Sequence, residues 1–128
     1  MKILIVDDNQ KIVEQVKTAF SRNVDYTVDV AYNGKEGLDT MKAQGPYDLV
    51  ILAILIPKLN GMEVCEAMLQ DETLKAIPVL LISVLPVESE VFQKSLKKFD
   101  ELSMVKGVLE KPFSDEDLLA KVKEIVEN

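Results

Sequence analysis

Histidine is absent from the sequence, and cysteine occurs once, as Cys65. Without histidine, the chain lacks the commonest general base and metal ligand of enzymes. A lone cysteine cannot form an intramolecular disulfide, so the reducing cytoplasm is the expected compartment. Cys65 lies in an apolar stretch with helical spacing, and we therefore expect a small buried hydrophobic side chain and not a reactive thiol.

Long hydrophobic runs and basic clusters are missing as well. The longest apolar run, residues 49–56, is far shorter than the roughly 20 residues that cross a bilayer. An apolar strand is expected from residue 3 onward, which leaves no room for a signal peptide and favours a cytoplasmic protein without a membrane partner. With 15 basic and 22 acidic residues the net charge is −7, which argues against nucleic acid as a partner.

The composition, 48% hydrophobic and 29% charged over 128 residues, is typical of one globular domain spanning 1–128. Apolar runs without alternation are typical of parallel strands covered on both faces, and they occur at 3–6, 27–31, 49–53, 77–82 and 107–109. Between these runs, apolar residues recur at helical spacing: Ile12, Val16, Ala19, Phe20; Leu38, Met41; Val64, Cys65, Met68, Leu69; Phe92, Leu96, Phe99; and Leu118, Val122, Ile125, Val126. Strict alternation with right-handed crossovers predicts an α/β fold with a doubly wound, five-stranded parallel sheet.

Capping residues mark several expected helix ends. Either Asp8 or Asn9 is placed to cap the first helix, and the Gly45-Pro46 pair ends the second. Ser114, with Asp117 three residues later, resembles a capping box that opens the last helix.

Functional side chains are expected at one edge of the sheet. Asp7 and Asp8, Ala53, Ser83 and Lys111 lie at or just past the ends of the first, third, fourth and fifth runs. In doubly wound sheets ligands bind beyond the carboxyl ends of the strands. The sequence therefore predicts that polar groups from three strands converge around Ala53.

Each polar group has two interpretations. The Asp7-Asp8 pair suits a hard divalent cation such as Mg²⁺, and the structural alternative, compatible with it, is that Asp8 or Asn9 caps the first helix. The Ser83 hydroxyl would bind a phosphoryl oxygen, or it satisfies a loop backbone. Lys111 would serve as a point charge for phosphate, or it is a surface charge.

The sequence resembles the CheY-like receiver domain of two-component response regulators. The resemblance is carried by residues 3–9, by the Pro57…Asn60-Gly61 loop and by residues 111–113. The resemblance covers the whole chain. It implies a (βα)5 flavodoxin-like fold with strand order 2-1-3-4-5, and a cis Lys111–Pro112 bond. Because the family's phosphoacceptor aspartate corresponds to Ala53, the chain has no oxygen there and is expected to be phosphorylation-incompetent.

The resemblance also implies a magnesium site. Asp8 would bind Mg²⁺ directly, Asp7 would bind it through water or by positioning, and the Leu55 carbonyl would be a further ligand. Ser83 and Lys111 would hold phosphoryl oxygens. With a third carboxylate at position 53 the site would sum to −2, whereas with Ala53 it sums to −1, so weakened Mg²⁺ binding and a more stable metal-free protein are expected.

Two positions depart from the family pattern, and both belong with Pro112 to the expected switch and partner face. The residue after Ser83 is usually small, but here it is Val84, which is expected to crowd the phosphoryl site. Three residues before Lys111 many relatives carry an aromatic ring, and here it is Val108. Both valines also fit strand residues that pack against a helix.

We expect a stand-alone response regulator, with no output domain after Asn128, that works by protein contacts and is not an enzyme. Its parental form would accept a phosphoryl group from a histidine kinase or phosphotransferase near the first helix and would be a weak autophosphatase. A target would bind the face formed by the fourth helix, fifth strand and fifth helix, and the chain would be a monomer or weak dimer.

The alternative function is that of a natural pseudo-receiver, which acts as a phosphorylation-independent adaptor. Ala53 has two possible origins: it is native to such a pseudo-receiver, or it silences a working receiver. The intact acidic pair and Lys111 favour the silenced version, and both origins stay open. A small-molecule binder or hydrolase on the same architecture has less support. No phosphate-binding Gly-rich motif occurs, and a phosphatase of the Asp-x-Asp type would need an acid at position 9, which is Asn.

Overall fold

A computed structural model describes residues 1–56, 58–84, 90, 94, 97 and 102–127. Strands and helices alternate in the order β1 (Lys2–Val6), α1 (Gln10–Phe20), β2 (Thr27–Ala31), α2 (Gly34–Gln44), β3 (Leu49–Ala53), α3 (Gly61–Leu69), β4 (Val79–Ser83), β5 (Val105–Glu110) and α5 (Asp115–Val126). Pro57 and the helical stretch expected around Phe92, Leu96 and Phe99 lie outside the described residues.

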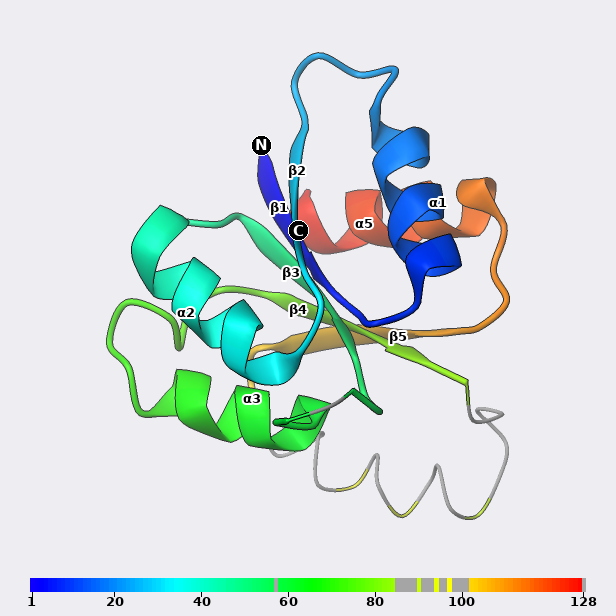
Figure 1. Cartoon of the computed structure of the whole chain (residues 1–128). Coiled ribbons are helices and arrows are strands. Elements are labelled where there is room, and N and C mark those ends of the chain that lie inside the picture. The colour runs from blue at the N-terminus through cyan, green and yellow to red at the C-terminus, as the bar shows by residue number, and fades with distance from the viewer. Residues whose placement is uncertain (57, 85–89, 91–93, 95–96, 98–101, 128) are drawn as a thin grey trace.

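The five strands form one parallel sheet in the order β2-β1-β3-β4-β5 (Figure 1). This confirms the doubly wound architecture and the strand order. The central strands β1, β3 and β4 are almost entirely buried, which explains why their sequences are apolar without alternation. The edge strands β2 and β5 are only partly covered.

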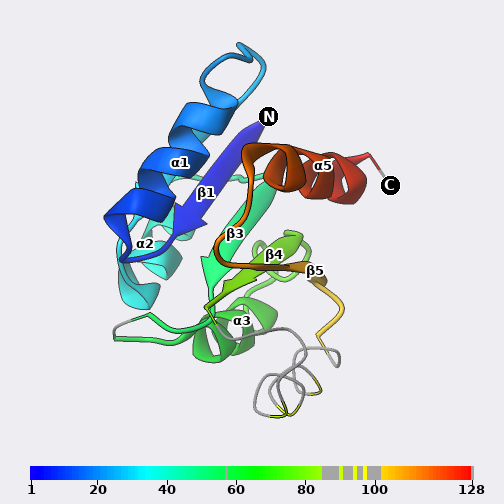
Figure 2. The ribbon, with the colours of Figure 1, turned by 90° about the vertical axis from the view of Figure 1, so that its right-hand side faces the viewer.

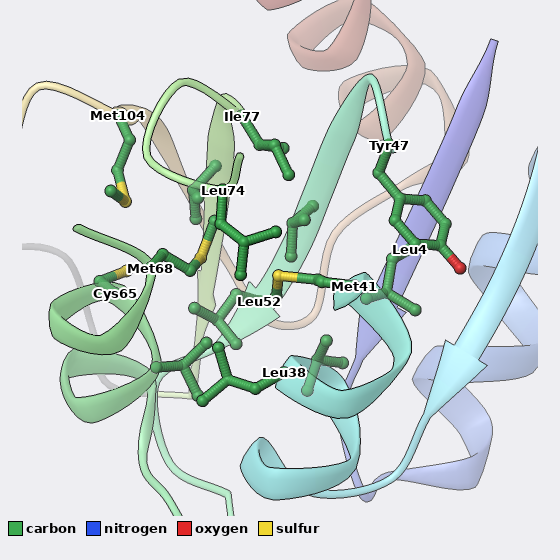
Figure 3. Close-up of a cluster of buried hydrophobic side chains, with 14 of the residues drawn as sticks. Leu4, Leu38, Met41, Tyr47, Leu52, Cys65, Met68, Leu74, Ile77 and Met104 are labelled. Carbon is green, nitrogen blue, oxygen red and sulfur yellow. The ribbon is translucent and has the colours of Figure 1, made fainter. Parts of the chain in front are cut away.

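Helices cover both faces of the sheet, with α1 and α5 on one face and α2 and α3 on the other (Figures 1 and 2). Alternate residues of each central strand enter opposite cores, because successive side chains of a strand point to opposite faces. For example, Leu4 packs in the core under α2 and α3, and Ile5 packs under α1 and α5. Figure 3 shows the first of these cores, in which Leu52 of β3 lies among side chains from α2 and α3.

Two strand boundaries differ from the sequence prediction. The fourth strand begins at Val79 and not at residue 77, because Pro78 has no N–H to donate to a ladder. The fifth strand spans Val105–Glu110 and is longer than the predicted 107–109. The pairing of β4 with β5 is irregular: Val79 pairs with Val105, but Leu80 pairs with Gly107. The exposed Lys106 is left between these two partners and interrupts the apolar pattern of β5.

Side chains cap the helices next to the site. The Asn9 side chain accepts hydrogen bonds from the backbone N–H groups of Lys11 and Ile12, so Asn9, and not Asp8, caps α1. Asn60, which the sequence placed in a loop, caps α3 and forms a reciprocal capping box with Glu63.

At α5, Ser114 accepts from the Asp117 N–H at 3.0 Å, as predicted. Cys65 is buried in α3, and burial raises the pKa of its thiol to about 12, which confirms a small hydrophobic side chain. No helix in the described part of the chain is long and apolar enough to cross a bilayer.

Candidate functional site at the carboxyl ends of the strands

The ends of β1, β3, β4 and β5 meet at one edge of the sheet. Val6 pairs with Leu52, Ala53 pairs with Ile82, and Ser83 pairs with Glu110. The parallel arrangement therefore carries the residues at and after these ends to the same side, as the arrowheads of β1 and β3 show in Figure 2.

Asp7 and Lys111 form a buried ion pair at this edge. The Lys111 Nζ lies 2.7 Å from Asp7 Oδ2, and the side chains are only 10% and 1% exposed, respectively. The structure thus brings together two residues that are 104 positions apart in the sequence. Burial of both groups makes this pair more consequential than a surface salt bridge, because breaking it would leave a charge without a partner away from water.

Local backbone bonds hold the Asp7 carboxylate in place. Its Oδ1 accepts a hydrogen bond from the Asn9 N–H at 3.0 Å, and the Asp7 N–H donates to the Ala31 carbonyl at 3.1 Å. The Lys111 ammonium contacts Oδ2 without the alignment of a hydrogen bond, and no other group in the described part of the chain donates to that oxygen. Oδ2 is therefore held by charge alone.

Lys111 is positioned by a backbone hydrogen bond to the end of β4. Its N–H donates to the Ser83 carbonyl at 2.7 Å, which extends the β4–β5 ladder by one residue. The Lys111–Pro112 bond is cis, which confirms the expectation drawn from the family resemblance. Ser83 is buried at the end of β4, next to the strand that carries Ala53.

Ala53 ends β3 and is 1% exposed. Its methyl group packs in the core shared with α1 and α5. Gly61, the first residue of α3, approaches so closely that a Cβ there would lie 2.9 Å from the Ala53 carbonyl oxygen. The strand end is held by the Ile54 N–H, which donates to the Ile82 carbonyl at 3.1 Å. Position 53 is thus a closely packed place with no side-chain oxygen.

The remaining predicted residues lie around this centre. Asp8 and Leu55 are exposed. Val84 is 56% exposed, and with Pro112 it lines an open cavity of about 400 Å³ beside Lys111 and the first turns of α1. Val108 is half-buried, pairs with Leu81 and packs against the core under α2 and α3, as the packing interpretation predicts.

One residue of this region carried no signal in the sequence. The Gln15 side-chain amide on α1 donates to the Phe113 carbonyl at 2.8 Å and to Asp115 Oδ1 at 3.0 Å. It ties α1 to the segment that follows the cis bond. Its partners lie about a hundred positions away, so no local pattern could have identified the contact.

The side chains do not fit a resident magnesium ion. In the described part of the chain, no group of three or more His, Cys, Asp or Glu side chains is placed to hold a metal. Asp7 is already paired with Lys111, and Ala53 supplies no oxygen. Mg²⁺ prefers a near-ideal octahedral shell of oxygen ligands, and the exposed carboxylate of Asp8 alone contributes little to such a shell.

Comparison with known proteins agrees with this geometry. A family model described as "Response regulator receiver domain" matches residues 3–123. The chain is 32% identical over 131 aligned positions to "Response regulator ArlR" of Staphylococcus epidermidis and 30% identical over 132 to that of Staphylococcus aureus. These matches cover 97% and 98% of the chain and 52% of each relative, so the chain spans about half the length of the curated relatives it matches.

Solved structures show the same likeness. The chemotaxis protein CheY4 of Vibrio cholerae superimposes with a TM-score of 0.84 at 25% identity, covering 97% of both chains. The receiver domain of Francisella response regulator 1452 superimposes with a TM-score of 0.80 at 28% identity, covering 98% of this chain and 96% of the other.

Proposed function

Because this chain belongs to the response regulator receiver domains of two-component systems, we propose that it is an acceptor-less receiver that signals through protein contacts. The observation that carries the proposal is Ala53. It occupies the end of β3, next to the buried Asp7, Ser83 and Lys111, where the receiver resemblance places the acceptor aspartate.

Chemistry at position 53 supports this proposal. Accepting a phosphoryl group requires a nucleophilic oxygen placed in line with the leaving group. The Ala53 methyl group has none. The nearest buried carboxylate, Asp7, is engaged by Lys111 and by the Asn9 N–H. The remaining polar groups are therefore those of a phosphorylation site whose nucleophile has been removed.

The edge formed by the carboxyl ends of the strands also suggests where partner proteins bind. Lys111, Pro112, Val84 and α1 border one open cavity, which offers a histidine kinase or phosphotransferase a contact beside the former acceptor. A target would bind the face that includes β5 and α5. We further propose that Mg²⁺ binds only weakly, because the site sums to −1.

The test restores the acceptor. Ala53→Asp, the unaltered chain and Ala53→Asn are incubated with Mg²⁺ and acetyl phosphate, and intact mass is measured. We expect one metal-dependent phosphoryl adduct on the Asp variant alone. Ala53→Asn is the matched control, because its side chain has nearly the same size but a poor nucleophile.

An adduct on the unaltered chain would contradict the acceptor-less state. If no variant reacts, Ala53 is not what silences the site, and a phosphorylation-independent adaptor becomes the better explanation.

A further inference from the structure

A groove lies between the carboxyl end of α1 and the amino end of α5. This α1–α5 groove has a volume of about 590 Å³ and is lined by residues 18–20, 22–24, 26, 115, 116 and 119. Its floor is apolar, because Phe20 is buried and its ring lies 5.0 Å from that of the half-buried Tyr26. Leu119 lines the groove from α5 and is 39% exposed. Apolar surface is therefore accessible on this side of the molecule.

The two walls of the α1–α5 groove carry opposite charges. Arg22, just beyond the carboxyl end of α1, is the one arginine in the sequence. Asp115 and Glu116 line the groove from the first turn of α5. Each sign suits its own helix end, because a helix favours cations at its carboxyl end and anions at its amino end. The packing of α1 beside α5 thus places a basic wall opposite an acidic one.

The charges of the two walls do not neutralise each other within this chain. In the described ranges, Arg22 and Glu116 form no ion pair, although both line the same groove. Asp115 is engaged locally, since its Oδ1 accepts from the Gln15 amide at 3.0 Å. The exposed guanidinium of Arg22 and the exposed carboxylate of Glu116 are therefore accessible to another molecule.

The loop at 21–26 presents an exposed valine beside the groove. Val24 is 97% exposed, and the loop projects past the end of α1 (Figures 1 and 2). Hydrogen bonds order this loop: the Asn23 N–H donates to the Phe20 carbonyl at 3.2 Å, and the Asp25 N–H donates to Asn23 Oδ1 at 2.9 Å. An ordered loop loses little conformational entropy when it binds a partner.

We propose that the α1–α5 groove binds a second copy of this chain across a two-fold axis. In a two-fold interface the same surface patch occurs on both copies, so contacts form in reciprocal pairs. Arg22 of each copy then contacts Glu116 of the other, and Val24 of each copy covers apolar surface beside Leu119 of the other. A partner of one charge sign would satisfy only one wall, whereas a rotated copy of the groove satisfies both.

This inference goes beyond the proposed function and does not depend on it. The cavity proposed for a kinase borders the first turns of α1, whereas the α1–α5 groove borders its last turn. Ala53 lines neither of them. Because exposed ion pairs contribute little individually, the expected complex is a weak dimer.

The experiment is sedimentation equilibrium of the full chain from about 10 μM to about 1 mM, which covers dissociation constants in that range. It is run at about 0.15 M salt, because a Debye length of about 8 Å screens most of the repulsion between copies of net charge −7.

The unaltered chain is compared with Arg22→Glu, Glu116→Arg, Val24→Ser and Lys17→Glu. Lys17→Glu is the matched control, because Lys17 is exposed in the last turn of α1 but does not line the groove. All four residues are exposed, so folding should be unaffected, and circular dichroism checks this.

We expect the unaltered chain and Lys17→Glu to dimerise alike. Arg22→Glu and Glu116→Arg should each dimerise at least about tenfold more weakly, because two attractive pairs per dimer become two repulsive ones. Val24→Ser should weaken the dimer without changing any charge. An equimolar mixture of Arg22→Glu and Glu116→Arg should regain the dimer, because the glutamates of one copy then face the arginines of the other.

Three results would overturn the proposal. An unaltered chain that stays monomeric at about 1 mM would leave the groove to a partner of different sequence. Charge-reversed groove variants that dimerise as well as Lys17→Glu would place the dimer contact elsewhere. A mixture of the two charge-reversed variants that stays monomeric would show that Arg22 and Glu116 do not meet across the axis.

Discussion

Restoring an aspartate at position 53 should destabilise the protein when no metal is present. The position is 1% exposed, and the buried Asp7 carboxylate already uses the Lys111 ammonium. A second buried carboxylate, next to Asp7 and the exposed Asp8, would bring the site to three negative charges for one buried positive charge. Like charges in a confined site raise the free energy of the folded state.

The size of the repulsion depends on the distance between the two carboxylates. Two like charges about 4 Å apart repel by about 4 kcal/mol at an effective dielectric constant of about 20. Attraction of the new carboxylate to Lys111 offsets part of this repulsion, whereas loss of hydration adds to it. We expect Ala53→Asp to lower the free energy of unfolding by about 2 kcal/mol, which is a fall of roughly 6–10 °C in Tm for a chain of this length.

The assay is urea unfolding followed by circular dichroism, in EDTA and again with Mg²⁺. Ala53→Asn separates charge from size, because it fills the same space without the negative charge. In EDTA the Asn variant should be clearly more stable than the Asp variant, and Mg²⁺ should restore stability to the Asp variant only.

Two results would refute this reasoning. An Asp variant that is as stable as the unaltered chain in EDTA would show that no net repulsion exists at this edge. Equal losses for the Asp and Asn variants would assign the effect to crowding beside the closely packed strand end, and not to charge.

Two further predictions concern packing and pH. Gly34→Ala should destabilise the protein by about 1–3 kcal/mol, because a Cβ would lie 2.0 Å from the backbone oxygen of Leu59. In Gly37→Ala the new Cβ would meet the Val6 side chain at 3.0 Å, so urea unfolding should show a smaller loss of stability. Burial raises the pKa of the Cys65 thiol from 9.0 to about 12. Above pH 9 the folded state therefore retains a proton that the unfolded state loses. The free energy of unfolding should be unaffected below pH 9 and fall by up to about 1.4 kcal/mol per pH unit above it. Unfolding of Cys65→Ala over the same pH range should lack this component, and an unchanged slope in that variant would contradict the assignment.

Much of the fold could be predicted because its signals are local. Residues 49–53 are apolar on both faces, which indicates a strand covered by two layers, and the structure confirms this burial at every position. The burial of Cys65 and the capping roles of Asn9 and Ser114 follow from neighbours only a few positions away. The bounds of the fifth strand were predicted incorrectly as 107–109, because its extent, Val105–Glu110, and the irregularity at Lys106 depend on its pairing with β4.

Position 53 was identified in the same way, from a strand that ends in alanine where the receiver pattern has its acceptor. That this strand ends in a methyl group needs no coordinates. By itself, however, the sequence could not say what the polar groups around that methyl group contact. Val84 was expected to crowd the phosphoryl site, and this stays a prediction: the structure places Val84 more than half exposed at the wall of an open cavity that Lys111 also lines.

The sequence by itself determined the alternation of strands and helices, the edge of the sheet at which Asp7, Ser83 and Lys111 gather, and the methyl group at position 53. Only the tertiary structure decided that Lys111 pairs with Asp7 and that Gln15 ties α1 to the segment after the cis bond. The physical reason is the range of the forces involved. Hydrophobic periodicity and capping depend on residues within a few positions, whereas a buried ion pair depends on which strand ends the sheet order brings within reach of one side chain.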